Sequence, residues 1–211
     1  MIFNMNDLNN LHLDVLKELG NIGAGNAATA LAKMIDKKIN MNVPETKVLE
    51  FSRISALLGG AEITVTGILL SVTGDVKGNI MFILRESAAH KLVNLLLGQE
   101  DKDDVDLENS EFNEIELSAL KEIGNILASS YLSALSTLTN LRMYPSVPDI
   151  AIDMAGAILS VPAIEFGKVG DTVLYIETEF SEGMKKIVGD FFLVPEIDSF
   201  DTLLKALGVA N

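Results

Sequence analysis

Residues 14–31 of the chain read DVLKELGNIGAGNAATAL, and residues 118–135 read SALKEIGNILASSYLSAL. The second stretch begins 104 positions after the first, and nine of the 18 aligned residues are identical, including most of the block L-K-E-[L/I]-G-N-I. Repetition of a segment at a fixed offset is the sequence signature of a duplicated structural unit. The chain therefore reads as two copies of one unit.

The duplication predicts one domain over residues 1–211, made of two pseudo-symmetric repeats at about 8–98 and 114–208. A linker at 99–113 joins the repeats, and its composition is strongly acidic. Such a run of like charges is typical of a solvated connection. Because two copies of a mixed unit bury equivalent apolar faces, we expect them to pack about a pseudo-twofold axis.

Hydrophobic periodicity predicts the same order of elements in both repeats: a long helix, a short strand, a short helix, two strands and a closing helix. Residues 113–116, which read NEIE, have the form of a capping box that opens the second long helix. The fold class is therefore α/β of the α+β kind, with antiparallel β-strands and the long helices on one face. The expected elements are Leu8–Met34, Met41–Leu49, Ser52–Leu58, Ile63–Thr73, Lys77–Leu84 and Ser87–Leu97, then Glu114–Thr139, Arg142–Val147, Asp149–Val161, Thr172–Glu179, Ile187–Val194 and Asp198–Leu207.

The composition excludes several classes of function. Apolar residues make up 48% of the chain, which is too many for a disordered protein. The 16 basic and 30 acidic residues give a net charge of −14, so phosphate backbones and anionic membrane surfaces are repelled. There is no run of 18 apolar residues, and residues 1–10 do not resemble a signal peptide. We therefore expect a cytoplasmic protein with no membrane insertion and no nucleic-acid partner.

Metal and cofactor chemistry has little to build on in this sequence. The chain has no cysteine, which removes thiolate catalysis and cysteine-ligated metals. The two histidines, His12 and His90, are too few for a multi-histidine metal site. The glycines at 20–25 form neither a Walker A loop nor a dinucleotide fingerprint, because they lie within a predicted helix. We expect no metal and no cofactor bound by this chain.

Polar residues follow one face of each long helix. At 100° per residue, positions i, i+4, i+7 and i+11 lie within about 60° of each other and form a narrow strip. A different face of the first helix carries the expected buried stripe of Val15, Leu16, Leu19, Ile22 and Ala30. The first strip consists of Asp14, Glu18, Asn21 and Gly25, and the second of Ser118, Glu122, Asn125 and Ser129.

The strips are unusual for a helix that serves only as scaffold. Asp14 and Glu18 place like charges at i and i+4, and asparagine is a poor helix former in mid-helix. A glutamate and an asparagine on one solvent face are commonplace in a single copy. Both copies keep them while other positions have changed, as where Gly23 aligns with Leu127. Their retention favours a functional role over a plain surface.

The repeated spacing [D/S]-x-x-x-E-x-x-N resembles the CheC family of chemotaxis phosphatases, the group that includes CheX and FliY. The run LKELGNIGAGNAATAL at 16–31 is highly characteristic of that family, and the resemblance covers essentially the whole chain. It implies a phosphatase that hydrolyses the aspartyl phosphate of the response regulator CheY. Phosphorylated CheY is then the substrate, and Mg²⁺ is expected on that regulator rather than on this chain.

The resemblance also implies roles for individual residues. Glu18 and Glu122 take the family's acidic position, and Asn21 and Asn125 take its amide position. An amide both donates and accepts hydrogen bonds, so it can orient the attacking water as a glutamine does in GTPases. A glutamate can pair with the regulator's lysine and fix the docked register. Asp14 and Ser118 fill the first motif position and are supporting residues.

A second hypothesis is a non-enzymatic adaptor that binds phosphorylated CheY, the receptor deamidase CheD, or both. Resemblance to members of the family that bind CheD points to the expected helix Asp149–Val161. That segment is rich in small and apolar residues, and Asp153 lies near its charged rim. A charged rim around an apolar helix is typical of a docking element, although the segment could equally only cover the sheet. Asp153 is the candidate CheD-binding residue.

Overall fold

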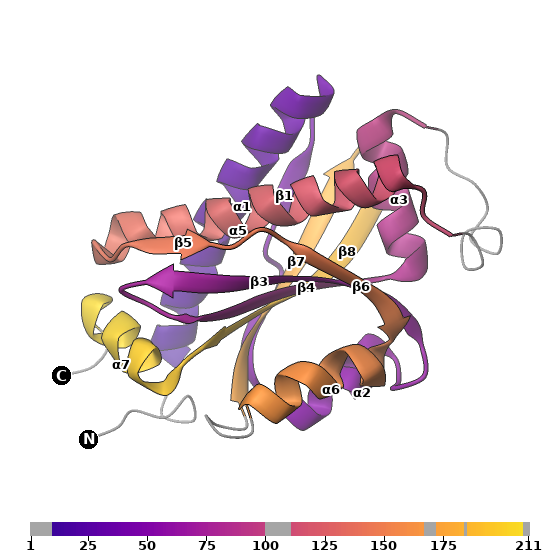
Figure 1. Ribbon diagram of the computed structural model, residues 1–211. Helices are drawn as coiled ribbons and strands as arrows, with labels where there is room; N and C mark the ends of the chain where they lie inside the picture. The colour runs from indigo at the N-terminus through magenta and orange to yellow at the C-terminus, as the bar shows by residue number, and fades with distance from the viewer. Residues whose placement is uncertain (1–9, 100–110, 167–171, 184, 209–211) are drawn as a thin grey trace.

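The computed structural model of the protein describes residues 10–99, 111–166, 172–183 and 185–208. Most of the expected acidic linker at 99–113 lies outside these residues. Six α-helices, one 3-10 turn and eight β-strands occupy the described ranges, and their order is shown in Figure 1. The helices are α1 (Asn10–Ile35), α2 (Ile54–Leu58), α3 (Glu86–Leu97), α5 (Glu114–Thr139), α6 (Ala155–Phe166) and α7 (Ile197–Ala206), with the 3-10 turn η2 (Phe51–Arg53) before α2.

The strands form one sheet, in which the order β1-β7-β8-β4-β3-β5 is completed by β2 beside β7 and by β6 beside β3. All of the pairings are antiparallel, so the α+β fold expected from the sequence is confirmed. The strands are β1 (Asn40–Asn42), β2 (Thr46–Glu50), β3 (Thr64–Gly74), β4 (Gly78–Arg85), β5 (Met143–Pro145), β6 (Asp149–Met154), β7 (Thr172–Glu182) and β8 (Lys185–Pro195).

The two repeats exchange their first strands. β1 and β2 of the first repeat pair with β7 of the second, and β5 and β6 of the second repeat pair with β3 of the first. At the centre of the sheet, β4 and β8 pair with each other, from Gly78 opposite Pro195 to Ile83 opposite Asp190. Each repeat therefore completes the sheet of the other, and the pseudo-twofold relation passes through the central pair.

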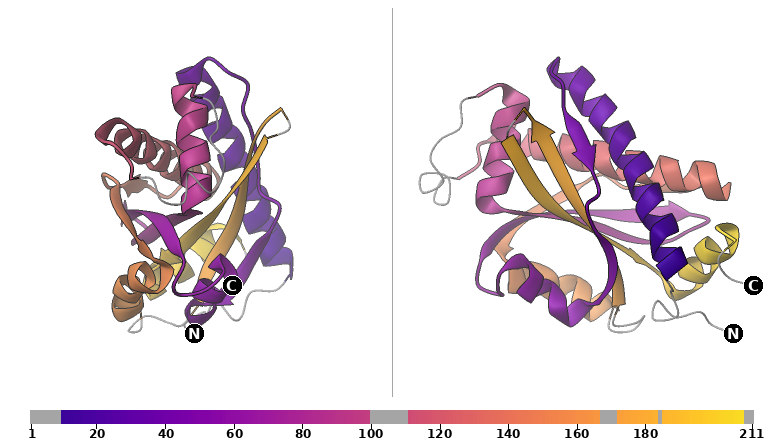
Figure 2. Two further views of the ribbon diagram at one scale, coloured as in Figure 1. Left: turned by 90° about the vertical axis from the view of Figure 1, so that its right-hand side faces the viewer. Right: turned by 180° about the vertical axis from the view of Figure 1, so that it is seen from behind.

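Helices cover both faces of this sheet. The long helices α1 and α5 cross each other on one face, next to α3, whereas α2 and α6 lie on the opposite face (Figure 2). The larger core lies under the long helices, where Leu19 and Leu127 meet sheet residues such as Phe82. A smaller core lies under the short helices around Ile54 and Phe192. This arrangement leaves the outer sides of α1 and α5 free for contact with other molecules.

Local sequence explains where α5 begins and ends. Oδ1 of Asn113 accepts hydrogen bonds from the backbone N–H groups of Ile115 and Glu116, and the Glu116 carboxylate accepts from the Asn113 N–H in return. This capping box was expected from the sequence and is confirmed. At the other end, Asn140 adopts a left-handed conformation, with φ of 57°, and its N–H bonds to the Ser136 carbonyl. The helix is thereby held at both ends in a fixed register.

Two glycines allow the long helices to pack closely. A Cβ atom at Gly23 would lie 2.6 Å from Cδ1 and 3.0 Å from Cα of Tyr131, so Gly23 marks the crossing of α1 and α5. A Cβ atom at Gly124 would lie 2.5 Å from Cγ2 of Ile68 on β3. Because glycine has no side chain, α1 approaches α5 closely at Gly23 and α5 approaches β3 closely at Gly124.

The structure corrects the expected helix at Asp149–Val161. Residues Asp149–Met154 form strand β6 beside β3, and the helix begins only at Ala155. The segment Asp149–Met154 reads DIAIDM, an alternation that a strand satisfies once an unpaired strand edge is available to it. Asp153 is therefore an exposed residue on an edge strand, and its Oδ1 accepts a hydrogen bond from the Met154 N–H at 2.7 Å.

The expected buried stripe on α1 is correct only in part. Leu16 and Leu19 are buried, but Ile22 is 41% exposed. The reason is that Gly23 and Ala24 occupy the contact with α5, which turns Ile22 outward. Among the helices in the described ranges, none combines the length and the apolar character needed to cross a membrane.

The glycines of α1 provide a matched test of this packing. Gly23→Ala is expected to lower the free energy of unfolding by about 1–3 kcal/mol, because the new methyl group must push α5 away. Gly25→Ala is expected to raise it by up to about 1 kcal/mol, because no neighbouring group lies within 4 Å and alanine is the better helix former. Urea denaturation of both variants measures the difference, and equal effects would contradict the proposed crossing.

Candidate functional site

The first strip lies on the outer side of α1. Asp14, Glu18 and Gly25 are exposed, and Asn21 is half-buried. Glu18 and Asn21 are one turn apart on this helix, as the spacing predicts. The Glu18 side chain is exposed, whereas the Asn21 amide is covered in part by the backbone at Val43. The structure thus places these sequence-predicted residues together on one exposed surface.

The second strip has the same layout on α5. Ser118, Glu122, Asn125 and Ser129 are all exposed. Ser118 Oγ donates a hydrogen bond to the carbonyl oxygen of Glu114 at 2.8 Å, so this hydroxyl is engaged within its own helix. Glu122 and Asn125 project from a helix whose N-terminal cap is fixed. The two strips belong to different helices and form two separate surfaces.

The environments of the two asparagines differ. The backbone N–H of Val43 donates a hydrogen bond to Oδ1 of Asn21, with 3.0 Å between the nitrogen and the oxygen. One turn earlier, Nζ of Lys17 donates to the carbonyl oxygen of Pro44 at 2.9 Å. Two hydrogen bonds therefore tie the segment Val43–Pro44 to the strip on α1. These contacts have no local sequence signature, because they join residues more than 20 positions apart.

The second repeat lacks this arrangement although its sequence is the same at the key positions. Val147 and Pro148 align with Val43 and Pro44, but Val147 is 84% exposed whereas Val43 is 3% exposed. Among the described residues, the Asn125 side chain makes no hydrogen bond. Asn125 therefore presents both its donor and its acceptor atoms to an incoming molecule, and Asn21 presents chiefly its Nδ2 donor.

The strips are suited to contact with another macromolecule rather than to enclosing a small one. A carboxylate and an amide on a convex helix surface can reach into a partner's cleft and supply one ion pair and one oriented hydrogen bond. No strip residue lines the clefts described below, so these side chains are placed to act on a group that a partner brings to them.

Exposed apolar residues flank the strips and were missed by the sequence reasoning. Ile115 is 68% exposed and lies one turn before Ser118, and Ile22 follows Asn21 directly. Exposed isoleucines beside a polar strip can add apolar contact area to a docking surface. Placing Ile115 on a helical wheel beside the strip could have identified it from the sequence. The exposure of Ile22 could not be predicted without knowing where α1 and α5 cross.

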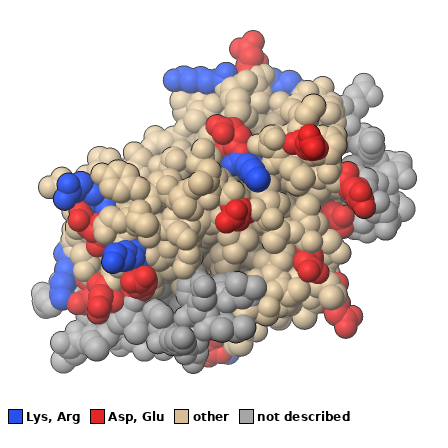
Figure 3. Space-filling model, in the orientation of Figure 1, with Lys and Arg blue, Asp and Glu red and all other residues tan. Residues whose placement is uncertain are grey.

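Acidic side chains are distributed over the surface around α5. On the face drawn in Figure 3, Asp and Glu side chains are dispersed and do not gather in one patch. This distribution agrees with the net charge of −14, which repels anionic partners through the general field of the protein. Contact of this surface with an anionic partner would therefore depend on local interactions.

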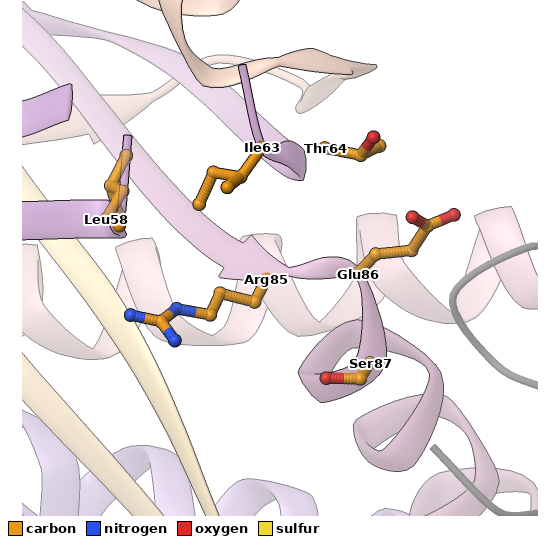
Figure 4. A pocket seen from close by; sticks show the side chains of 7 residues that line it. Leu58, Ile63, Thr64, Arg85, Glu86 and Ser87 are labelled. Atoms are coloured by element: carbon orange, nitrogen blue, oxygen red, sulfur yellow. The ribbon is translucent and has the colours of Figure 1, made fainter. Parts of the chain in front are cut away.

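A separate cleft lies near the start of α3. It has a volume of about 420 Å³. Its wall is formed by Leu58 at the end of α2, by Ile63 just before β3 and Thr64 at its start, and by Arg85 and Ser87 where β4 meets α3 (Figure 4). Arg85 and Glu86 point in opposite directions along its wall. An adjoining cleft of about 370 Å³ shares Arg85 and contains a charged cluster of Tyr175, Glu177 and Asp190 with Lys91 and Lys186.

The charged cluster has a defined hydrogen-bond pattern. The Tyr175 hydroxyl donates to Oδ1 of Asp190 at 2.9 Å. The pKa of Asp190 is raised above its usual value, chiefly by burial and also by the charge of Glu177. The hydrogen bond from Tyr175 and the charges of Arg85 and Lys47 act in the opposite direction and reduce this rise. Burial also raises the pKa of Tyr175, and the carboxylates of Asp190 and Glu177 add to that rise. No strip residue lines either cleft, so the clefts are separate from the strips.

Other candidate ligands do not assemble into a site. His90 is buried and stacks on Phe112 with 3.8 Å between the ring centroids. His12 belongs to α1, and its side chain lies outside the described ones. Within the described ranges, no group of three or more His, Asp or Glu side chains is arranged to hold a metal ion.

Comparison with known proteins gives consistent results. A model of the CheC-like family matches residues 11–48 and 115–152, one segment in each repeat. The chain is 38% identical over 207 residues to the CheY-P phosphatase CheC of Bacillus subtilis, and the match covers 97% of this chain and 98% of that protein. It is 25% identical over 148 residues to the flagellar motor switch phosphatase FliY of the same organism, covering 70% of this chain and 37% of that protein.

The fold also matches a solved structure. The crystal structure of Thermotoga maritima FliY superposes with a TM-score of 0.74 at 23% identity, and the match covers 97% of this chain and all of that one. Both strips lie within the segments that match the family model, since 11–48 contains Glu18 and Asn21 and 115–152 contains Glu122 and Asn125.

The charged cluster predicts a pH-dependent stability. Because the pKa of Asp190 is raised in the folded protein, the unfolded chain ionises first, and stability is lost as the pH rises from the usual carboxyl pKa through the folded one. Asp190→Asn keeps an acceptor for the Tyr175 hydroxyl and cannot ionise. The variant is expected to gain stability relative to the wild type between about pH 3 and pH 7. Thermal melts at both pH values measure this, and a constant difference would contradict the burial of an ionisable carboxyl.

Proposed function

The chain belongs to the CheC-like family, and we propose that it hydrolyses the aspartyl phosphate of phosphorylated CheY. The observation that carries this proposal is the presentation of a glutamate and an asparagine, one turn apart, on two exposed helices of matching sequence. The relative that is a CheY-P phosphatase aligns with nearly the whole chain, which supports the same activity here. The assignment also implies a cytoplasmic protein, because its substrate is a cytoplasmic regulator.

The proposed mechanism assigns the reacting groups to two molecules. The regulator brings the acyl phosphate and the Mg²⁺ that neutralises it, and this chain contributes neither a metal nor a nucleophile. The asparagine amide, Asn21 or Asn125, holds a water molecule in line with the phosphorus atom. Restricting the water to that position removes an orientational entropy cost from the barrier. Attack of the water on phosphorus breaks the bond to the aspartate oxygen and yields inorganic phosphate.

The glutamates are proposed to fix the docked register. Glu18 and Glu122 are exposed and lie one turn before the asparagines, so each can form an ion pair with a lysine of the regulator. A helix that supplies the ion pair and the amide from successive turns inserts both into one open site. Asp14 and Ser118, a further turn away, are proposed to support the helix end rather than to take part in the reaction.

The two sites are expected to differ in how they present the amide. Asn125 is exposed and makes no hydrogen bond with the described residues, so it can meet the water with either end of its amide. Asn21 has its Oδ1 occupied by the Val43 N–H, so it meets the water as a donor through Nδ2. A donor suffices, because the water oxygen accepts that hydrogen bond and attacks with its other lone pair.

A non-enzymatic adaptor is the second candidate function, with phosphorylated CheY or the receptor deamidase CheD as the bound protein. For CheD, we propose a surface around Asp153 at the edge strand β6. Ile152 and Met154 beside it are exposed apolar residues, 40% and 49% accessible. An unpaired strand edge with exposed apolar side chains and a charge is suited to protein contact.

The double variant Asn21→Ala with Asn125→Ala tests the phosphatase. It is expected to lower the rate of phosphate release from phosphorylated CheY by on the order of 100-fold or more, since no water is then oriented. Each single variant is expected to retain the activity of the other site. The measurement is steady-state phosphate release with the protein at a lower concentration than CheY. A double variant that folds normally and keeps the wild-type rate would contradict the assignment, and wild-type protein that binds without turnover would favour the adaptor.

Asp153→Lys tests the CheD surface. Reversing this exposed charge is expected to weaken CheD binding at least several-fold through electrostatic mismatch, while phosphate release by the two helices stays unchanged. Asp149→Lys is a matched control, because Asp149 is an exposed residue on the same strand and the same sheet face. Equal loss of CheD binding in both variants would indicate a nonspecific charge effect, and no loss in Asp153→Lys would place the CheD surface elsewhere.

A further inference from the structure

The segment Val43–Pro44 is attached to the strip on α1, and this attachment distinguishes the first site from the second. Oδ1 of Asn21 accepts from the Val43 N–H at 3.0 Å, and Nζ of Lys17 donates to the Pro44 carbonyl at 2.9 Å. Lys17 and Asn21 are four residues apart, so they lie on the same side of the helix. Their two hydrogen bonds reach consecutive residues of the segment and hold it alongside the strip.

We propose that Lys17 is a positioning residue for the Asn21 site, acting through the segment Val43–Pro44, and that its counterpart Lys121 has no such role. This inference rests on the proposed function and concerns how one of its two sites is built. Lys17 does not touch the reacting atoms in this account. It holds the segment whose backbone N–H orients the Asn21 amide.

Packing explains why the segment lies against α1 and not against α5. A Cβ atom at Gly20 would lie 3.3 Å from Cγ2 of Val43, so the glycine gives Val43 its place against the helix. Gly20 also lies near Ile176 of β7, and the equivalent glycine, Gly124, lies near Ile68 of β3. The three atoms nearest a Cβ at Gly124 all belong to Ile68, and Val147, the counterpart of Val43, is exposed. The valine therefore packs against the helix glycine in the first repeat and turns outward in the second.

The attachment has a direct chemical consequence for the amide. An asparagine side chain rotates about χ2 with little preference, which exchanges its oxygen and nitrogen. The Val43 N–H donates to this side chain, so it favours the orientation in which Oδ1 faces the N–H and Nδ2 points outward. A group held by a neighbour in its reactive orientation loses less entropy at the transition state. Asn125 gains no such restriction from the described residues.

Lys17 is a suitable residue to test this because it can be changed with little effect on folding. Its hydrogen bond to Pro44 is at the surface, and contacts of that kind contribute little to overall stability. Lys17→Met removes the donor and keeps the length of the aliphatic chain, whereas Lys17→Arg retains a donor. Lys121→Met removes the same charge from the matching position of α5, which controls for a general electrostatic effect on docking.

The experiment isolates each site by using asparagine variants as backgrounds. In Asn125→Ala, only the first site remains, and Lys17→Met is expected to lower kcat for phosphate release by on the order of tenfold, with KM nearly unchanged. Lys17→Arg is expected to restore most of the rate, and Lys121→Met to leave it unchanged. In Asn21→Ala, where only the second site remains, Lys17→Met is expected to have no effect.

Hydrogen exchange of the Val43 amide gives a readout that does not depend on catalysis. Lys17→Met is expected to speed this exchange several-fold, and Lys121→Met is expected to leave it unchanged. Equal effects of Lys17→Met and Lys121→Met on kcat would overturn the proposal. An Asn125→Ala protein that releases no phosphate would also overturn it, because the Asn21 site would then have no activity. Wild-type protein that releases no phosphate would overturn the proposed function instead, while the exchange rates would still report whether Lys17 holds the segment.

Discussion

The exchange of strands between the two repeats is the constraint on which the rest of the structure depends. β7 carries β1 and β2 of the other repeat, and β3 carries β5 and β6, so neither repeat has a complete sheet of its own. The long helices follow the same exchange, since Gly20 of α1 lies near Ile176 on β7 and Gly124 of α5 lies near Ile68 on β3. Each helix is therefore anchored by strands that are distant in sequence, and the side that it exposes is fixed by the fold of the whole chain rather than by local propensity.

This anchoring explains how surface residues can act in a defined geometry. Side chains on a lone helix are imprecisely placed because the helix itself frays and bends. Here the capping box fixes the start of α5, the Gly23 contact fixes the crossing, and both helices seat on one sheet. A glutamate and an asparagine one turn apart then keep their separation without a surrounding cavity. A rigid convex surface of this kind suits a partner that brings a reactive group in an open cleft, which is the arrangement that the proposed function requires.

Much of this organisation follows from the sequence, because duplication and helical periodicity are local signals. The order of most elements, the bounds of α5 and the exposure of Glu18 and Glu122 were predictable, although the expected strand Met41–Leu49 is divided into β1 and β2. The predictions were wrong where contacts between distant segments determine the structure. Residues 149–154 were expected in a helix because small and apolar residues follow them, yet the free edge of β3 draws them into a strand. Ile22 was expected to be buried, but the close crossing at Gly23 assigns that side of α1 to solvent. The hydrogen bond from Val43 to Asn21 joins residues 22 positions apart and has no local signature.

The two strips illustrate that an identical motif does not guarantee an identical site. Lys17, Glu18, Gly20 and Asn21 recur as Lys121, Glu122, Gly124 and Asn125. A sheet isoleucine lies beside each glycine, Ile176 beside Gly20 and Ile68 beside Gly124, but Val43 packs against Gly20 as well, whereas its counterpart Val147 is exposed. The packed valine is also the residue whose backbone N–H reaches Asn21. After a duplication, each copy meets the strands of the other, and these strands need not remain alike. Residues outside the motif can therefore change how an amide is presented while the motif itself stays intact. The functional divergence of a repeated site is then to be sought in its packing neighbours and not in the residues that define it.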